Sequence, residues 1–192
     1  IHILKVDRLG NPLFSKVLSS TISCDFIRSV HKKGDNIVIS GYESDFCTVP
    51  YNFKAKAKYL EIDTNGVILK EWIESDYGNY FGGGGLMPTS DGGWIECGSY
   101  LDSFALTPGP TYWYRCFVAK LDENFSRQWI RFIGNPTHLY NYLDYLEIDN
   151  EGNYLVAGGY VIGTGHKPSS PFQMSGVVAK VSPTGKVLWT NL

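Results

Sequence analysis

The sequence predicts an all-β fold built from a repeat, and two landmarks that recur with the same spacing carry this prediction. The first landmark is an apolar run that ends in an acidic or hydroxyl residue and is followed by a short turn and an aromatic residue. It occurs four times, in residues 3–14, 59–72, 117–129 and 178–189. The acidic or hydroxyl positions are separated by 56, 59 and 60 residues, and they are Asp7, Asp63, Asp122 and Ser182.

The second landmark is a short strand-like run that ends in glycine. Its copies are residues 36–41, 93–98 and 153–158, which are offset by 57 and then 60 residues. Two independent landmarks that share one period indicate a repeat protein.

Each repeat contains four short apolar runs separated by turn residues, a pattern typical of β-strands. Pairs such as Asn65-Gly66 between two apolar runs are a strong hairpin signal. No helical periodicity is visible. The predicted strands are residues 26–30, 37–41, 57–62, 67–73, 85–88, 94–98, 116–121, 127–133, 143–148, 154–158, 176–181 and 186–192.

Four antiparallel strands in a repeat of about sixty residues correspond to one blade of a β-propeller. A β-solenoid would need a shorter period, and a sandwich would not repeat its turn chemistry in register. We therefore expect a half blade in residues 1–18 and blades in residues 19–74, 75–133 and 134–192. Because closed propellers typically have four to eight blades, the chain is expected to be a piece of a larger propeller.

Composition describes an ordinary globular protein. The 192 residues are 43% hydrophobic and 19% charged, with a net charge of −2, which gives no reason to expect nucleic acid as a partner. No apolar run is long enough to span a membrane as a helix. The chain opens at Ile1 without an initiator Met, so a targeting segment is expected to have been removed or to lie outside this sequence.

Residues 89–94 (Thr-Ser-Asp-Gly-Gly-Trp) and 179–189 resemble the roughly sixty-residue propeller repeats of secreted and outer-membrane-associated bacterial proteins. The resemblance covers nearly the whole chain and implies a binding or scaffolding module outside the bacterial cytoplasm. The last hairpin also resembles the repeat of quinoprotein-type propellers and of the propeller lipoprotein of outer-membrane barrel assembly, although Ser182 replaces the Asp of that repeat.

The segments between the second and third strands, and between blades, are long and rich in aromatic residues. Long loops on a rigid scaffold often bind ligands, and Tyr and Trp give large contact areas at low entropic cost. The alternative is that these side chains only hold the loops against the blades. The candidate binding residues are Tyr42, Phe46, Tyr51, Phe53, Tyr77, Tyr80, Tyr100, Tyr112, Trp113, Tyr114, His138, Tyr140, His166 and Phe172.

Other chemistry is weakly supported. The turns at residues 63–66 and 149–152 are acidic but lack the ligand set of a calcium loop, so no metal is expected. Residues 82–85 are four glycines, but no Lys-Ser/Thr follows, which favours a flexible blade connection over a phosphate loop. No nucleophile motif or unusual carboxylate pair is visible, and no catalytic residue or cofactor is assigned.

Two functions remain open. The first is a non-enzymatic binding or scaffold propeller, secreted or held at the bacterial surface, that recognises a protein or a glycan through its aromatic loops. The second is an enzyme with its site in the central channel, either a quinone-dependent dehydrogenase or a carbohydrate-active propeller. A bound quinone would give a visible chromophore, and a carbohydrate-active enzyme would degrade polysaccharide.

The four cysteines allow two disulfides or none. Aligned repeats place Cys97 and Cys116 on adjacent strands, where they are expected to face each other, and Cys24 and Cys47 form a second candidate pair. The alternative is reduced cysteines buried as small apolar residues. The aromatic residues of the first landmark are expected to pack between neighbouring blades: Phe14, Trp72, Trp129 and Trp189.

Overall fold

The computed structural model describes residues 2–17, 24–44, 55–74, 80–105, 111–134, 140–162 and 173–191. In these ranges the chain forms strands and turns, without a helix. Within the same ranges, no helix is long and apolar enough to cross a membrane. The chain divides into two compact units, Ile1–Tyr80 and Phe81–Leu192, which are described separately.

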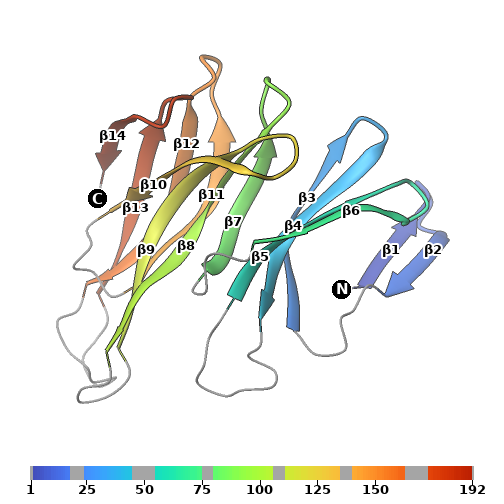
Figure 1. Cartoon of the computed structure of the whole chain (residues 1–192), viewed down its shortest axis with the longest axis horizontal. Helices are drawn as coiled ribbons and strands as arrows, with labels where there is room; N and C mark the ends of the chain where they lie inside the picture. Colours follow the sequence, from blue (N-terminus) through green and yellow to red (C-terminus); the bar gives the residue numbers. More distant parts are fainter. Residues whose placement is uncertain are drawn as a thin grey trace. The chain divides into compact units, whose positions relative to one another are not determined.

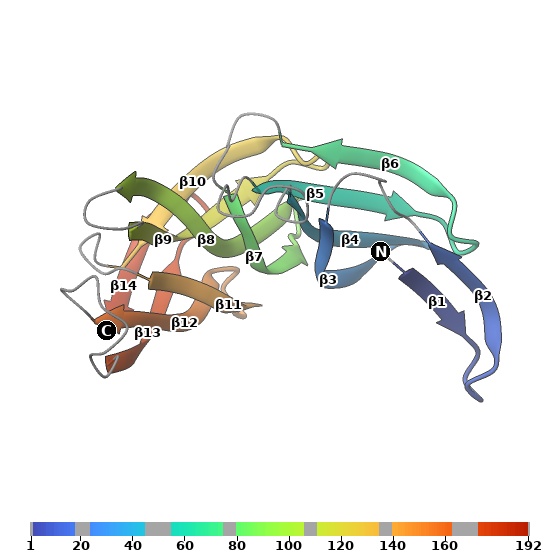
Figure 2. The ribbon, with the colours of Figure 1, turned by 90° about the horizontal axis from the view of Figure 1, so that it is seen from below.

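All sheets are antiparallel, and strands that follow each other in the chain are neighbours in the sheet (Figure 1). The first unit holds the hairpin β1–β2, drawn from another side in Figure 2, and the four-stranded sheet β3–β6. The second unit holds the four-stranded sheets β7–β10 and β11–β14. The bounds are β1 His2–Val6, β2 Pro12–Val17, β3 Cys24–Lys33, β4 Asn36–Ser44, β5 Ala55–Ile62, β6 Ile68–Ile73, β7 Tyr80–Pro88, β8 Trp94–Ala105, β9 Thr111–Leu121, β10 Arg127–Ile133, β11 Tyr140–Ile148, β12 Tyr154–Ile162, β13 Gln173–Val181 and β14 Val187–Asn191.

The four turns of the first landmark share one pattern of backbone hydrogen bonds, and a side-chain oxygen adds to it in each turn. In the turn at Asp63, the side-chain Oδ1 accepts from the backbone N–H groups of Asn65 and Val67, at 2.8 Å each. Asp7 and Asp122 bond the corresponding N–H groups of their own turns. Ser182 Oγ accepts from the N–H of Lys186 at 3.0 Å. A short side-chain oxygen that bonds the backbone locally explains why Asp and Ser recur here.

A turn of the same kind connects the first and second strands in two of the four-stranded sheets. Asp149 Oδ1 accepts from the N–H groups of Glu151 and Asn153, at 2.9 and 2.8 Å. In the other sheet, Thr89 takes the backbone position of Asp149. Asp91 Oδ1 accepts hydrogen bonds from the hydroxyl of Thr89 and from the N–H of Gly93. The acidic turns are therefore organised by their own backbone N–H groups, which accounts for their composition without a metal.

A β-bulge recurs in the first strands of two sheets. Arg28 in β3 is the extra residue opposite Gly41 in β4, and Asp144 in β11 is the extra residue opposite Gly158 in β12. At both glycines a Cβ would come closer than van der Waals contact to a backbone carbonyl oxygen, that of Phe26 or of Tyr142. The glycine that ends the second landmark therefore lets two backbones approach at a bulge.

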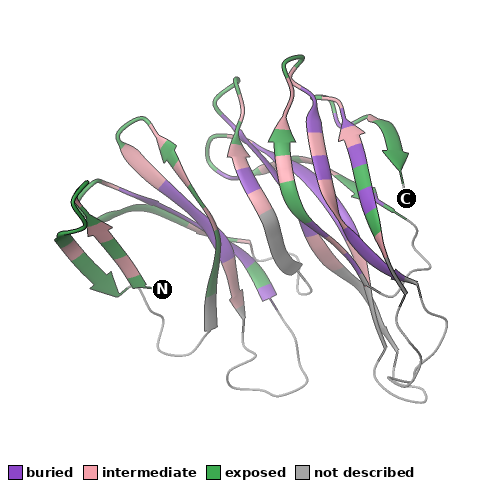
Figure 3. Cartoon of the chain, turned by 180° about the vertical axis from the view of Figure 1, so that it is seen from behind, coloured by how far each residue is buried: buried purple, intermediate pink, exposed green. Residues whose placement is uncertain are grey.

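Each unit buries its own core between sheets. In the first unit, Ile39, Leu60 and Ile62 form a cluster against which Ile3 of the hairpin β1–β2 packs. In the second unit, side chains of β7–β10 such as Ile95 and Val118 pack with side chains of β11–β14 such as Val156. Figure 3 shows the resulting alternation of buried and less buried residues along the strands.

Several strands are longer than the sequence pattern predicts. Pairing of β8 with β9 continues from Trp94–Leu121 to Ala105–Thr111, so much of the predicted loop is sheet. Aromatic and β-branched residues favour extended backbone, which explains the extension. The interpretation of residues 82–85 as a flexible connection is wrong, because these glycines lie in β7. A Cβ at Gly85 would lie 3.3 Å from Leu146 Cβ of β11, so this glycine serves close packing of two sheets.

Candidate functional site

The candidate binding residues do not all lie in loops. Half of them belong to strands, which corrects the prediction that they lie in loops; these are Tyr42, Tyr80, Tyr100, Tyr112, Trp113, Tyr114 and Tyr140. The others lie outside the described residues: Phe46, Tyr51, Phe53, Tyr77, His138, His166 and Phe172. Among the seven in strands, the structure describes the side chains of Tyr42, Tyr100 and Tyr114, and the candidate site is sought around them.

Tyr42 is the centre of an aromatic–arginine cluster in the first unit. It lies opposite Phe26 in the β3–β4 pair, and the two rings stack with centroids 4.7 Å apart and planes 19° from parallel. The guanidinium of Arg28, the bulge residue, lies 5.5 Å from the centroid of the Tyr42 ring. Phe26 remains 42% exposed, so the cluster offers an aromatic surface and a cation to solvent.

A buried lysine lies beside this cluster. Lys58 of β5 pairs across the sheet with Gly41 and forms ion pairs with Glu43 (3.7 Å) and Glu71 (3.2 Å). A small depression around Gly41 is lined by both aromatic residues of the cluster and by Lys58, and it has no room for a water molecule. This geometry suits contact with an extended surface rather than engulfment of a small molecule.

Tyr100 belongs to a second cluster of the same composition, in the second unit. Its ring is 5.6 Å from that of Phe132 on β10, at an angle of 60°. Arg115, which pairs with Tyr100 across β8 and β9, places its guanidinium 4.0 Å from the Phe132 centroid. Phe132 is 36% exposed. Each unit thus carries an exposed phenylalanine, a tyrosine and an arginine on adjoining strands.

Tyr114 has a structural role through its backbone. Its carbonyl oxygen accepts a hydrogen bond of 2.6 Å from the side-chain Nδ2 of Asn141, which is 3% exposed. This bond joins β9 to β11 of the neighbouring sheet. The bond uses the backbone of Tyr114 and not its ring, so it does not decide between the two interpretations of the aromatic segments.

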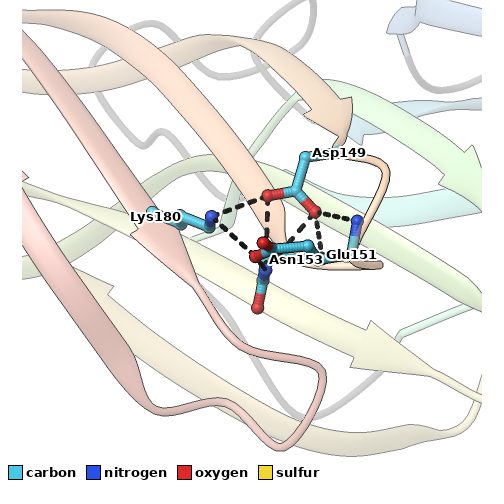
Figure 4. A network of polar contacts seen from close by, with 4 residues as sticks. All are labelled: Asp149, Glu151, Asn153 and Lys180. Atoms are coloured by element: carbon cyan, nitrogen blue, oxygen red, sulfur yellow. Dashed lines mark hydrogen bonds and ion pairs between the residues drawn. The ribbon is translucent and has the colours of Figure 1, made fainter.

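The turn ends of the sheets carry a polar network instead of aromatic residues. Figure 4 shows the network of the sheet β11–β14, in which Lys180 Nζ lies 2.8 Å from Asp149 Oδ2 and 3.3 Å from Glu151 Oε2. Asn153 donates to both acidic side chains. The hydrogen bond from Lys180 and those within the turn lower the pKa of Asp149 to about 2.

The network recurs with altered residues in the other sheets. In β7–β10 the buried Lys120 contacts Asp91 at 3.0 Å, and hydrogen bonds from Thr89 and Lys120 lower the pKa of Asp91 to about 2. In β3–β6 the charges are reversed, because Glu61 accepts from Lys33 and Asn36 at 3.3 and 2.6 Å. Burial opposes ionisation of Glu61, but these two partners hold its pKa below the usual value. In each sheet the network links the third strand to the turn between the first and second strands. We therefore assign it a structural role.

Cys97 and Cys116 do not face each other, so the predicted register is wrong. Cys97 pairs with Val118, and Cys116 pairs with Ser99, which places the two thiols on a diagonal. Both cysteines are free and buried. Burial raises the pKa of Cys97 strongly and that of Cys116 to about 12. Cys47 lies outside the described residues, so the structure does not address its pairing with Cys24.

Sequence reasoning missed four members of the two clusters: Phe26, Arg28, Arg115 and Phe132. Phe26 and Phe132 were assigned to strands, and the arginines carried no motif. The sequence signal that could have found them is a large aromatic residue near the end of a predicted strand, together with an arginine on the same or an adjoining strand. In the ranges that the structure describes, no three His, Cys, Asp or Glu side chains gather as they would to hold a metal ion.

No protein-family model matches the chain, and no curated protein is similar enough in sequence to be counted as a relative.

Proposed function

We propose that the chain is a non-enzymatic binding or scaffold module whose sheets are the blades of a β-propeller. The antiparallel, sequential order of the three four-stranded sheets supports the architecture, because each sheet repeats one plan and packs face to face with its neighbour inside a unit. A crystal structure in which the sheets share a common radial axis tests the propeller. Sheets stacked without such an axis would overturn it.

The aromatic–arginine clusters carry the functional proposal. Exposed aromatic rings fixed on rigid strands provide contact area at low entropic cost, and arginine adds a planar hydrogen-bond donor. A single cation–π contact at an exposed site contributes only about 0.5–1 kcal/mol, so the clusters are not explained by a large gain in stability. Tyr and Arg are among the residue types that contribute most to binding energy at interfaces, and Phe is enriched there.

The partner is a protein or a glycan. Both ligand classes present flat apolar faces for the Phe26–Tyr42 stack and polar groups for Arg28. The adjoining depression has no room for a small-molecule ligand, which favours an extended partner. The resemblance of the repeats to those of secreted and outer-membrane-associated bacterial proteins supports a location outside the bacterial cytoplasm.

Binding measurements with matched variants test this proposal. The chain is applied to a glycan array and to a panel of displayed bacterial surface proteins, and affinities of the captured ligands are measured for the wild type and for a Phe26→Ser/Tyr42→Ser variant. Loss of two aromatic anchors should cost at least about 2 kcal/mol, roughly a thirtyfold weaker Kd. Leu9→Ser is the control, since Leu9 is 79% exposed in a turn away from the cluster. Absence of any ligand, or equal affinities for all three proteins, would contradict the proposal.

A further inference from the structure

The turn between β9 and β10 contains an N-glycosylation acceptor motif. Asn124, Phe125 and Ser126 match the pattern Asn-X-Ser/Thr, in which X is any residue except proline. Residues 135–137 (Asn-Pro-Thr) have the same spacing, but the proline disqualifies them. Among the asparagines whose two following residues the sequence gives, Asn124 is therefore the single acceptor candidate.

The folded turn presents both polar side chains of the motif to solvent. Asn124 and Ser126 are exposed, whereas Phe125 between them is buried and stacks on Trp94 of β8. The buried ring anchors the turn to the sheet, so the two polar side chains stay at the surface. An N-linked glycan is bulky and needs such a surface position.

In the first unit, the position equivalent to Asn124 stays exposed although a neighbouring strand covers the turn. The ring of Phe14 on β2 lies against Gly66, where a Cβ would be 2.8 Å from Phe14 Cε2. Asn65, which precedes this covered glycine and occupies the position of Asn124, is nevertheless exposed.

The same relation holds in the second unit. The ring of Trp129 on β10 lies against Gly185, where a Cβ would be 2.9 Å from Trp129 Cδ2, and Thr184 before this glycine is exposed. A glycan at Asn124 therefore has room whether or not another sheet packs on its turn.

The turn itself requires neither the asparagine nor the serine of the motif. The residues that occupy these two positions in the other turns of the first landmark are Leu9 and Asn11, Asn65 and Val67, and Thr184 and Lys186. These pairs differ in size and chemistry although all four turns share one pattern of backbone hydrogen bonds. The pairing of Asn with Ser at positions 124 and 126 is thus not explained by folding of the turn.

We propose that Asn124 is the acceptor of an N-linked glycan. The proposal rests on the location outside the bacterial cytoplasm given under the proposed function, because the donor sugar and its transferase act on exported chains. The donor is an oligosaccharide carried on a polyprenyl pyrophosphate. The new bond joins Nδ2 of Asn124 to the anomeric carbon of the first sugar, while the bond from that carbon to the phosphate oxygen breaks. The pyrophosphate leaves with the electron pair, and one amide proton passes to a base of the transferase.

The hydrogen bonds of the closed turn place this transfer before the hairpin β9–β10 forms. The N–H of Phe125 donates to the Asp122 carbonyl at 3.1 Å, and the N–H of Asp122 donates to the Ser126 carbonyl at 2.9 Å. Asp122 Oδ1 accepts from the N–H groups of Asn124 and Ser126 at 2.8 and 2.9 Å. A transferase cannot draw this segment into its own site without opening the turn and exposing Phe125. The folded protein therefore only has to accommodate the finished glycan, which projects from an exposed position.

The attachment point is distant from the aromatic–arginine cluster of the same sheet. Arg115 precedes Leu121, the last residue of β9, by six positions, which corresponds to about 20 Å of strand. Loss of the glycan therefore removes no contact that the cluster makes with a partner, and glycosylation can be tested separately from binding.

Export of the chain in a bacterial host tests the proposal. The host carries a bacterial oligosaccharyltransferase and its polyprenyl-pyrophosphate-linked oligosaccharide, and a flexible tag with an acceptor peptide of that transferase is appended to the chain. Intact mass spectrometry should find two oligosaccharides on the wild type, one on the tag and one on Asn124. A single oligosaccharide, on the tag alone, would overturn the proposal.

Matched variants assign the added mass to the motif. Asn124→Gln and Ser126→Ala should each carry the tag oligosaccharide only, whereas Ser126→Thr should carry two. Asn135→Gln is the control for an Asn to Gln exchange and should also carry two. Two oligosaccharides on Asn124→Gln would contradict the assignment.

A transplanted motif tests whether this turn position accepts a glycan. Val67→Ser creates the motif at Asn65, in a turn that also has an Asp two residues before the asparagine, and Val67 is 50% exposed. This variant should carry three oligosaccharides, and the double variant Asn124→Gln/Val67→Ser should carry two. If Val67→Ser gained nothing, the turn position would not be an acceptor site.

Two further measurements test the order of events and the accommodation of the glycan. Folded, unmodified chain presented to the same transferase in detergent should be modified at Asn124 at least about tenfold more slowly than at the tag; equal rates would contradict transfer before hairpin closure. The glycosylated chain should have a Tm within about 2 °C of Asn124→Gln, since changes at exposed positions perturb stability little. A clearly lower Tm would show that the fold does not accommodate the glycan.

Ligand binding by the same variants distinguishes a failure of this proposal from a failure of the proposed function. Asn124→Gln should bind the ligands of the wild type with unchanged Kd. An unmodified chain that binds refutes only the glycosylation site, and a modified chain that binds no ligand refutes only the binding module.

Discussion

Phe125 occupies the turn position that glycine holds in the three other turns of the first landmark. Its φ is +65°, whereas Gly10, Gly66 and Gly185 take the same left-handed region without a side chain. The ring of Phe125 is 1% exposed and stacks on Trp94, with centroids 5.8 Å apart and planes 25° from parallel. The burial of the ring therefore offsets backbone strain that costs an L-residue roughly 1–2 kcal/mol.

This arrangement predicts an unusual order of stability for two substitutions. Phe125→Ala loses the buried ring and keeps the strain, so it should lower the free energy of unfolding by about 3–5 kcal/mol. Phe125→Gly also loses the ring but relieves the strain, and the gain exceeds the added entropy of glycine in the unfolded chain, about 0.4–1 kcal/mol. The glycine variant should therefore be more stable than the alanine variant by about 0.5–1 kcal/mol.

Urea denaturation of the two variants measures this difference. Ser126 follows directly, has no left-handed φ, and provides the control pair Ser126→Ala and Ser126→Gly, in which alanine should be the more stable. If alanine were the more stable residue at position 125 as well, the strain assigned to Phe125 would be refuted.

At the scale of the element, the contact between a fourth strand and the next turn sets how closely two sheets approach. Gly185 has φ +82°, and a Cβ there would lie 2.9 Å from the ring of Trp129. Gly152 has φ +80° in a turn of the same sheet, but a Cβ there would meet nothing within 4 Å. The two glycines share the left-handed backbone conformation, which would strain a residue with a Cβ, and they differ in packing.

Alanine at these two positions separates the two effects. Gly152→Ala should destabilise the protein by about 1 kcal/mol, from left-handed strain alone. Gly185→Ala should cost about 1–3 kcal/mol more, because Trp129 must move or leave the turn. Thermal unfolding followed by tryptophan fluorescence compares the variants, and equal losses would show that the ring does not pack tightly on Gly185.

The sequence was sufficient to predict the elements whose signals are local. The turns at Asp63 and Asp149 depend on a side chain that bonds N–H groups two and four residues later, so residue type alone indicates them. Strand order follows from the repeat of these turns. Within the described residues, this accounts for the hairpin and for the three four-stranded sheets.

Non-local geometry was not predictable in the same way. The bulge at Arg28 shifts the register of β3 against β4 by one residue. No sequence feature at that arginine predicts the bulge. The diagonal placement of Cys97 and Cys116 depends on where the β8–β9 hairpin closes, which the aromatic composition of the segment obscured. The aromatic–arginine clusters combine residues of two or three strands, so their members become recognisable only once register is known.

At the scale of the whole molecule, the second unit is held together by an apolar core in which both of its thiols are buried. Cys97 Sγ lies 3.7 Å from the carbonyl oxygen of Tyr145 and 3.9 Å from that of Leu143, both on β11. Cys97 is therefore covered by the neighbouring sheet and not only by its own. Access to this thiol requires the sheets β7–β10 and β11–β14 to separate.

Thiol labelling should consequently report on opening of the second unit. In a Cys24→Ser/Cys47→Ser background, Cys97 and Cys116 should resist a thiol reagent at pH 8 in the native protein, since burial blocks access and keeps both thiols protonated. Both should react quickly in denaturant under non-reducing conditions, which corresponds to two free thiols. Gly185→Ala should increase the native labelling rate of Cys97, because it weakens the contact that holds the two sheets together, whereas Gly152→Ala should increase it far less. Rapid labelling of the native wild type would contradict the packing of these sheets, and failure to label in denaturant would indicate that the two cysteines are bonded after all.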